Sequence, residues 1–150
     1  MDPAAIDALV AEAMVAARGG DASGALALLR KAEAAAPGDP NLKMQQALVY
    51  RITGALPQAI AALDQALAID PYNFLALLSK GAVLEKLSGE RAAARVYRNA
   101  IEIAPPEDKL PPHLVSPLAR ARAVVDGVDE ELETFLRGQI GPLSAAGGEL

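Results

Sequence analysis

The sequence predicts an all-α fold made of three helical hairpins and a further C-terminal helix. Three observations support this: prolines recur at a fixed interval, other positions repeat in register with them, and no segment reads as a convincing strand. The prolines are Pro37, Pro71 and Pro105, each 34 residues from the next. Proline ends a helix because it lacks an N–H and its ring clashes with the preceding turn. A fixed period of this length indicates a repeat architecture.

Four further columns recur in all three copies when the chain is aligned on these prolines. A small residue lies twenty-four positions before each proline, an alanine lies twelve and five positions before it, and a large residue lies eight positions before it. The columns are Ala13, Ala47 and Gly81; Ala25, Ala59 and Ala93; Ala32, Ala66 and Ala100; and Leu29, Leu63 and Tyr97. We interpret each copy as two helices in close contact, with the small residue of the first helix pressed against the second.

Capping residues predict where the helices begin. Asp2 and Asp39 each precede a proline, which suits an N-cap acid followed by proline at the first helical position. Asn73 can cap the first helix of the third copy in the same way. The expected helices cover residues 4–18, 22–36, 40–53, 57–70, 74–87 and 90–103.

The pattern changes after the third copy. Residues 105–112, "PPEDKLPP", hold four prolines and are not expected to be helical. We interpret residues 114–138 as a capping helix over the last apolar face of the stack, and residues 139–150 as a flexible tail or the start of a linker. Gly127 is a candidate for a break, so whether this segment forms one helix or two stays open. The cap has helical periodicity through Leu114, Leu118, Ala121, Val125, Val128, Leu132, Phe135 and Leu136.

The period and columns resemble the tetratricopeptide repeat (TPR) family over residues 6–105. The resemblance implies a right-handed α-α superhelix with repeats at about 6–37, 40–71 and 74–105, in a domain that ends near residue 138. The match is closer in spacing than in identity, since the family's favoured tryptophan is replaced in every copy. Its counterparts are Leu9, Lys43 and Leu77. We take these departures to indicate a divergent solenoid of the same fold.

Composition excludes several function classes. The net charge of −5 disfavours nucleic acid as the main partner, because such binding needs a basic surface. The chain has no cysteine and one histidine, His113, so it lacks the partners for a triad or a zinc site. We therefore expect no catalytic residue, no metal and no cofactor, and no enzymatic activity in this chain. No apolar run approaches about 18 residues and no secretory signal is recognisable, so we expect no membrane contact and a cytoplasmic location.

The TPR resemblance also assigns a binding surface. In TPR proteins the first helix of each repeat lines a concave groove, and we expect that groove to bind a peptide or an amphipathic helix, including the protein's own C-terminal domain. Its floor would hold Met14, Met44, Leu48 and Leu78. The alternative, that these side chains pack only against neighbouring helices, stays open. The positions carried over residue by residue are Val10, Met14, Arg18, Asn41, Met44, Gln45, Leu48, Arg51, Leu75, Leu78, Glu85 and Lys86.

One partner class is not expected. Co-chaperone TPR domains hold the C-terminal carboxylates of heat-shock proteins with lysine, asparagine and arginine side chains at several groove positions. The residues at those positions here are Val10, Met14, Gln45, Leu75 and Ser79. None is a cation, so the carboxylate clamp is missing.

A second resemblance concerns residues 94–136. The last repeat, followed by "APPEDKLPP" and "LARARAVV", resembles the N-terminal region of bacterial aspartyl/asparaginyl β-hydroxylase-like proteins, in which a TPR segment precedes an iron- and 2-oxoglutarate-dependent dioxygenase domain. It implies that this chain is the protein-interaction part of a larger enzyme. The alternative is a free-standing structural scaffold that self-associates through its terminal repeats, as a homodimer for example. Whether Leu150 is the natural C-terminus stays open.

Overall fold

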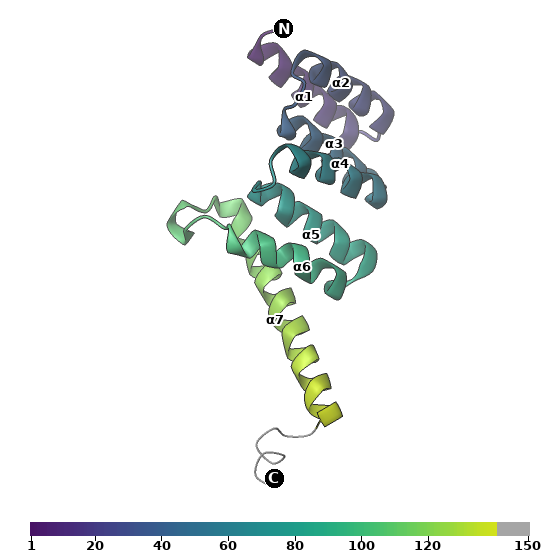
Figure 1. The fold of residues 1–150 in the computed structure, drawn as a ribbon. Helices are drawn as coiled ribbons and strands as arrows, with labels where there is room; N and C mark the ends of the chain where they lie inside the picture. The colour runs from purple at the N-terminus through teal and green to yellow at the C-terminus, as the bar shows by residue number, and fades with distance from the viewer. Residues whose placement is uncertain (141–150) are drawn as a thin grey trace.

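The computed structural model describes residues 1–140, and over that range all regular secondary structure is helical, as predicted. Consecutive hairpins stack along one axis, and the last helix runs out from the end of the stack (Figure 1). Most packing contacts are between helices that follow one another in the chain. In addition, α1 contacts α3 and α5 contacts α7. The elements are α1 (Pro3–Arg18), α2 (Ala22–Ala35), α3 (Pro40–Thr53), α4 (Leu56–Ile69), α5 (Phe74–Ser88), α6 (Glu90–Glu102), the short 3-10 helix η1 (Glu107–Lys109) and α7 (Pro112–Ile140).

The capping residues act as the sequence predicted. The side chain of Asp2 accepts a hydrogen bond from the backbone N–H of Ala5 at 2.7 Å, and Asp39 accepts one at the start of α3 at 2.9 Å. Asn73 caps α5 by accepting from the N–H of Ala76 at 3.1 Å. Each bond satisfies a backbone donor that has no partner inside the helix. Both ends of each of the first six helices lie within one residue of the expected positions.

The repeat columns form the core. All twelve column residues are buried, and each copy contributes to its own cluster of apolar side chains. The alanines let helices approach closely, while the large residue of the second helix fills the space beside the small residue of the first. The interpretation of each copy as a pair of closely packed helices is thus confirmed.

The third hairpin uses a different pair of residues for the same contact. Where the first two repeats pair alanine with leucine, this one pairs Gly81 with Tyr97. A Cβ atom on Gly81 would lie 2.4 Å from two carbons of the Tyr97 ring, so only glycine fits. The Tyr97 hydroxyl donates a hydrogen bond to Glu85 at 3.0 Å, and burial of this phenol raises its pKa. The Tyr97 side chain is therefore held by close contact of its ring with Gly81 and by the hydrogen bond of its hydroxyl to Glu85.

The C-terminal region corrects several expectations. The proline-rich segment contains η1, because its prolines flank residues 107–109 and leave them free to form one turn. The last helix begins at Pro112, contains Pro117, and continues unbroken through Gly127. Pro112 is the first residue of α7, where the N–H has no helical partner in any case. Pro117 lies one turn further in, so it removes one internal hydrogen bond, and the helix continues past it.

Only half of α7 acts as a cap. Its first half packs on α6 and α5 through buried residues that include Leu114, Leu118 and Val125. Its second half extends past the α5–α6 hairpin (Figure 1). The side chains of Leu132, Phe135 and Leu136 on this half are exposed. The expectation that these three residues continue the cap interface is wrong, because no element of the described chain reaches far enough to cover them.

None of the helices in residues 1–140 combines the length and the hydropathy of a membrane span.

Candidate interaction groove

A groove lies between α3 and α5, the first helices of the second and third repeats. One part is a cavity of about 340 Å³, lined by Met44, Leu48, Leu75 and Ser79 among others, with the buried Leu63 at its base. The second part is a cavity of about 310 Å³ whose lining residues include Ile52 and Lys86. Leu48 and Arg51 line both cavities, so the two parts are neighbours. We call this surface the α3–α5 groove.

The structure brings half of the residues assigned by the TPR resemblance to this groove. These side chains form an apolar floor, with cationic and amide side chains beside it. Leu48 keeps 36% of its surface exposed, which leaves an apolar contact for a ligand. The assigned residues that line the groove are Met44, Gln45, Leu48, Arg51, Leu75 and Lys86.

The other assigned residues are placed differently. Leu78 is only 3% exposed and belongs to the core of the third hairpin, which corrects its assignment to the groove floor. Val10 and Met14 are half-buried against the core of the first hairpin and line neither cavity. Glu85 is held by internal bonds. Arg18 and Asn41 are exposed without lining either cavity.

His113 lines the groove, a position that no sequence pattern predicted. It is the second residue of α7, and the proline-rich connection carries it back toward α3 and α5. The sequence pattern could not show this because the path of an irregular connection leaves no periodic signal. Four other lining residues that were not assigned are inward-facing parts of the repeat core: Ala47, Leu56, Leu63 and Val83.

A hydrogen bond links Met44 on α3 to the start of α5. Its sulfur accepts a hydrogen bond from the Nδ2 of Asn73 at 3.5 Å, while the Oδ1 of Asn73 caps α5. One side chain thus links α3 to the start of α5. A flexible, polarizable thioether at this point suits an apolar surface that must adapt to a ligand.

The charged side chains that line the groove are cationic. Arg51 and Lys86 are exposed, and no ion pair among residues 1–140 involves either of them. Each lies in the last turn of its helix, where a cation is favoured by the partial negative charge of the free carbonyls. Arg18 has the same place at the end of α1. The first helices of the three repeats therefore all end in a cation that is free to meet an anionic ligand.

The nearest acid on α5 is already engaged. Glu85 accepts from Arg120 of α7 at 2.6 Å and from the Tyr97 hydroxyl at 3.0 Å. The bond from Arg120 is the main cause of the lowered pKa of Glu85, so this carboxylate is ionised at neutral pH and satisfied internally. It therefore ties α7 to the last hairpin and does not neutralise the groove cations.

Within the described part of the chain, no three histidine, cysteine, aspartate or glutamate side chains lie close enough together to hold a metal ion.

Comparison with known proteins agrees with this geometry. A family model described as TPR repeat matches residues 47–88, which run from the middle of α3 to the end of α5 and contain most of the groove. Residues 47–88 thus match the TPR repeat family, and the fold of the chain is similar to that of solved TPR domains. A similar curated protein is the BBSome complex member bbs-4 of Caenorhabditis elegans, with 29% identity over 85 residues. That match covers 57% of this chain and only 18% of the relative's length.

Two solved TPR structures share the fold and were determined with peptides. One is the type III secretion chaperone SycD of Yersinia enterocolitica in complex with a peptide of the translocator YopD, with a TM-score of 0.70, 12% identity, and coverage of 87% of this chain and 96% of that chain. The other is the first TPR of Spaghetti (RPAP3) bound to the HSP90 peptide SRMEEVD, with a TM-score of 0.67, 18% identity, and coverage of 86% and 99% respectively.

Proposed function

We propose that this TPR protein is an interaction module that binds a peptide or amphipathic helix in the α3–α5 groove. The observation that carries the proposal is the combination of a partly exposed apolar floor, centred on Leu48, with cations that have no internal partner. The two TPR domains solved with peptides support the same mode of use for this fold.

The groove chemistry selects a class of ligand. An apolar floor shared by α3 and α5 suits a helix that presents large side chains three or four positions apart. Arg51 and Lys86 lie beside that floor, so acidic residues next to the apolar ones would gain favourable electrostatic contacts. The ligand we propose is therefore an amphipathic helix with an apolar stripe and acidic flanks.

A displayed peptide library tests this proposal. Peptides selected on the wild-type protein should share apolar residues at helical spacing and adjacent aspartate or glutamate. Leu48→Glu should abolish their binding, because a charge would enter the apolar floor beside ligand acids. Ile69→Glu is the matched control, since Ile69 is also exposed and apolar but lies at the end of α4, outside both cavities. Selected peptides that bind the Leu48→Glu variant as well as the wild type would refute the groove assignment.

We also propose that the groove does not act as a carboxylate clamp for heat-shock proteins. Gln45, Leu75 and Ser79 occupy the groove where clamp domains carry polar or cationic side chains that hold a terminal carboxylate. The peptide SRMEEVD provides the test. We expect it to bind more weakly than the selected helical peptides, because it offers no apolar stripe of comparable length. Equal or tighter binding would contradict this expectation.

We also propose, on the resemblance of residues 94–136 alone, that the module is the N-terminal part of a larger aspartyl/asparaginyl β-hydroxylase-like protein. The chain itself would then contribute binding and no catalysis, since a non-haem iron site needs two histidines and a carboxylate. The reading frame downstream of Leu150 is the test. A stop codon there would favour the alternative of a free-standing scaffold, and iron-dependent turnover of 2-oxoglutarate by these residues would refute catalytic silence.

A further inference from the structure

The outer part of α7 carries an apolar stripe that nothing covers in residues 1–140. We call residues 129–139 the α7 tip. Leu132, Phe135 and Leu136 in this tip are 55%, 60% and 48% exposed. Large apolar side chains gathered on one helix face are unusual on a free surface and mark a contact site.

The stripe is the continuation of a surface that is buried elsewhere on the same helix. Its positions follow one another at alternating spacings of four and three residues, the spacing of a helix that packs along a partner helix. The inner positions meet α6 and α5, whereas the outer ones have no partner. The stripe comprises Leu114, Leu118, Ala121, Val125, Val128, Leu132 and Phe135.

The last hairpin does not close over the tip. A shallow cavity of about 340 Å³ separates Arg91 of α6 from the Leu132 and Phe135 side of the helix. Two ion pairs run from α6 to the tip, one between Arg91 and Glu131 at 3.5 Å and one between Arg98 and Asp129, and all four side chains are largely exposed. Such surface pairs contribute little stability, so this face stays available to another molecule.

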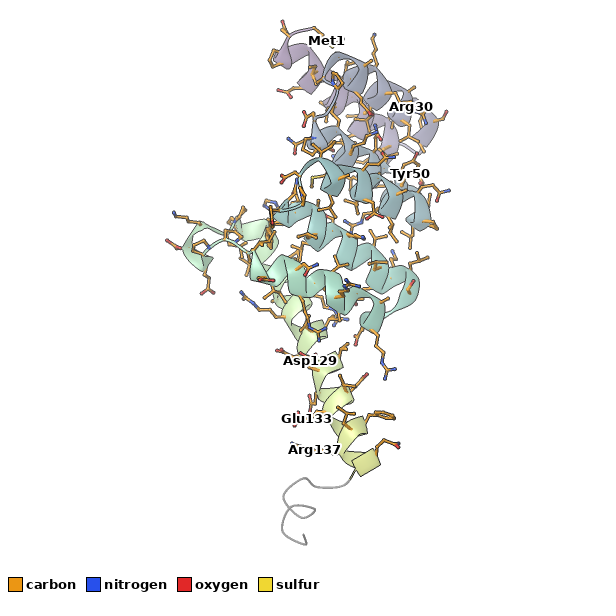
Figure 2. The ribbon with its side chains drawn as sticks, viewed as in Figure 1. Met1, Arg30, Tyr50, Asp129, Glu133 and Arg137 are labelled. Atoms are coloured by element: carbon orange, nitrogen blue, oxygen red, sulfur yellow. The ribbon has the colours of Figure 1, made fainter. Side chains whose placement is uncertain are left out.

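The charges around the stripe identify what it can meet. The tip carries four acids at positions 129, 130, 131 and 133 and one cation, Arg137, so acids are in excess. Asp129, Glu131 and Glu133 form ion pairs with Arg98, Arg91 and Arg137, but these are exposed surface pairs that a partner's cations can replace. Figure 2 shows Asp129, Glu133 and Arg137 along this projecting part of the helix. Two tips packed against each other would place acids beside acids, which disfavours that pairing. A surface that is apolar and cationic is the complement of the tip.

The α3–α5 groove of this protein is such a surface. It offers Leu48 and Leu75 for the apolar stripe and Arg51 and Lys86 for the acids, and no ion pair among residues 1–140 occupies those cations. The tip cannot reach the groove of its own molecule while α7 is one helix, because it extends away from α3 and α7 packs on α5 and α6 (Figure 1). The groove that the tip meets must then belong to another copy.

We propose that the α7 tip of one copy docks in the α3–α5 groove of a second copy of this chain. This inference rests on the proposed function, because it makes the tip an internal example of the acidic amphipathic helix that the groove binds. The contact joins two different surfaces, so two copies can exchange tips in a closed dimer or continue head to tail in a chain. Both arrangements leave the same residues in contact.

Light-scattering mass across a concentration series tests the contact. The tip variant Leu132→Gln/Phe135→Gln and the groove variant Arg51→Glu/Lys86→Glu change only exposed side chains, so both should keep the wild-type helical content by circular dichroism. The wild type should associate as concentration rises. Each variant alone should associate about tenfold more weakly or worse, since each lacks one side of the contact.

Mixing the two variants is the decisive measurement. The tip variant keeps an intact groove and the groove variant keeps an intact tip, so an equimolar mixture should recover a heterodimer that neither forms alone. A wild type that stays monomeric overturns the proposal, and so does a groove variant that still self-associates, which would indicate contact between tips. Deleting residues 141–150 should leave association unchanged, and its loss would overturn the assignment to the tip.

The same variants separate this inference from the function on which it rests. The tip variant, with its intact groove, should bind library-selected acidic peptides and also the tip of the groove variant. If it binds the peptides and not the other chain, the proposed function stands and the self-association is refuted. If it binds neither, the groove itself is not a binding site and both proposals fail.

Discussion

Replacing Gly81 by alanine tests how the third hairpin is packed. In α5 this glycine faces Tyr97 of α6, and an added methyl group would lie 2.4 Å from two ring carbons. The ring cannot move aside easily, because it is buried and its hydroxyl is bonded to Glu85. Overpacking of this kind costs about 1–3 kcal/mol, whereas alanine favours the helix over glycine by about 1 kcal/mol. We expect a net loss of up to about 2 kcal/mol of unfolding free energy.

We expect Tyr97→Leu to reverse the sign of the effect of Gly81→Ala. The double variant Gly81→Ala/Tyr97→Leu recreates the alanine–leucine pair that the first two hairpins use, so the added methyl group would have room. Tyr97→Leu alone should destabilise the protein, because a large buried side chain is lost. In that background Gly81→Ala should stabilise by about 1 kcal/mol, the helix preference of alanine without the steric cost.

Urea unfolding of the four proteins in this cycle measures the coupling, which we expect to be about 1–3 kcal/mol. Gly127→Ala is the control: Gly127 also lies inside a helix, and a Cβ there meets nothing within 4 Å. That variant should gain about 1 kcal/mol. An equal effect of Gly81→Ala in both backgrounds would refute the account of Gly81 as a residue required by the tyrosine ring.

Three further predictions follow from the packing and the charges. Ala59→Leu should cost about 1–3 kcal/mol in urea unfolding, because Ala59 is buried between helices with no room for a larger group, and an unchanged midpoint would contradict this. Leu48→Glu should lower the melting temperature only slightly, because Leu48 is already partly exposed, and outright unfolding would show that it belongs to the core. The lowered pKa of Glu85 means that its ionised form stabilises the fold above about pH 4.5, its ordinary value, and that this contribution disappears as pH falls through the lower folded value. Arg120→Gln should therefore reduce stability near pH 7 and flatten the loss of stability below about pH 4.5 relative to wild type. Parallel pH profiles would contradict the role of that pair.

The repeat fold could be predicted because its signals are local and periodic. A proline, a capping acid or an alanine column acts within a few residues of its own position, and three copies in register distinguish these signals from chance. Asp2, Asp39 and Asn73 thus located helix starts, and Ala59 and its equivalents located the helix contacts.

The parts that could not be predicted depend on what lies opposite a residue. Helical periodicity shows that Leu132 and Phe135 share a face with Leu118, but it cannot show that the hairpin beneath them ends first. The same limit applies to Leu78, which lies on the groove helix and points into the core, and to His113, which an irregular connection carries to the groove. Spacing gives the direction of a side chain along its helix, whereas burial depends on the length and path of its neighbours.

The stacked order of the contacts also determines which parts of the protein open first. The α1–α2 hairpin has a neighbour on one side only, so it can unfold while the rest of the stack stays folded. The groove helices α3 and α5 each have hairpins or α7 on both sides, so they can lose their structure only after an outer element has come away. Amide hydrogens in α3 and α5 should therefore exchange with solvent more slowly than those in α1. The terminal elements thus protect the binding surface by being the first to open.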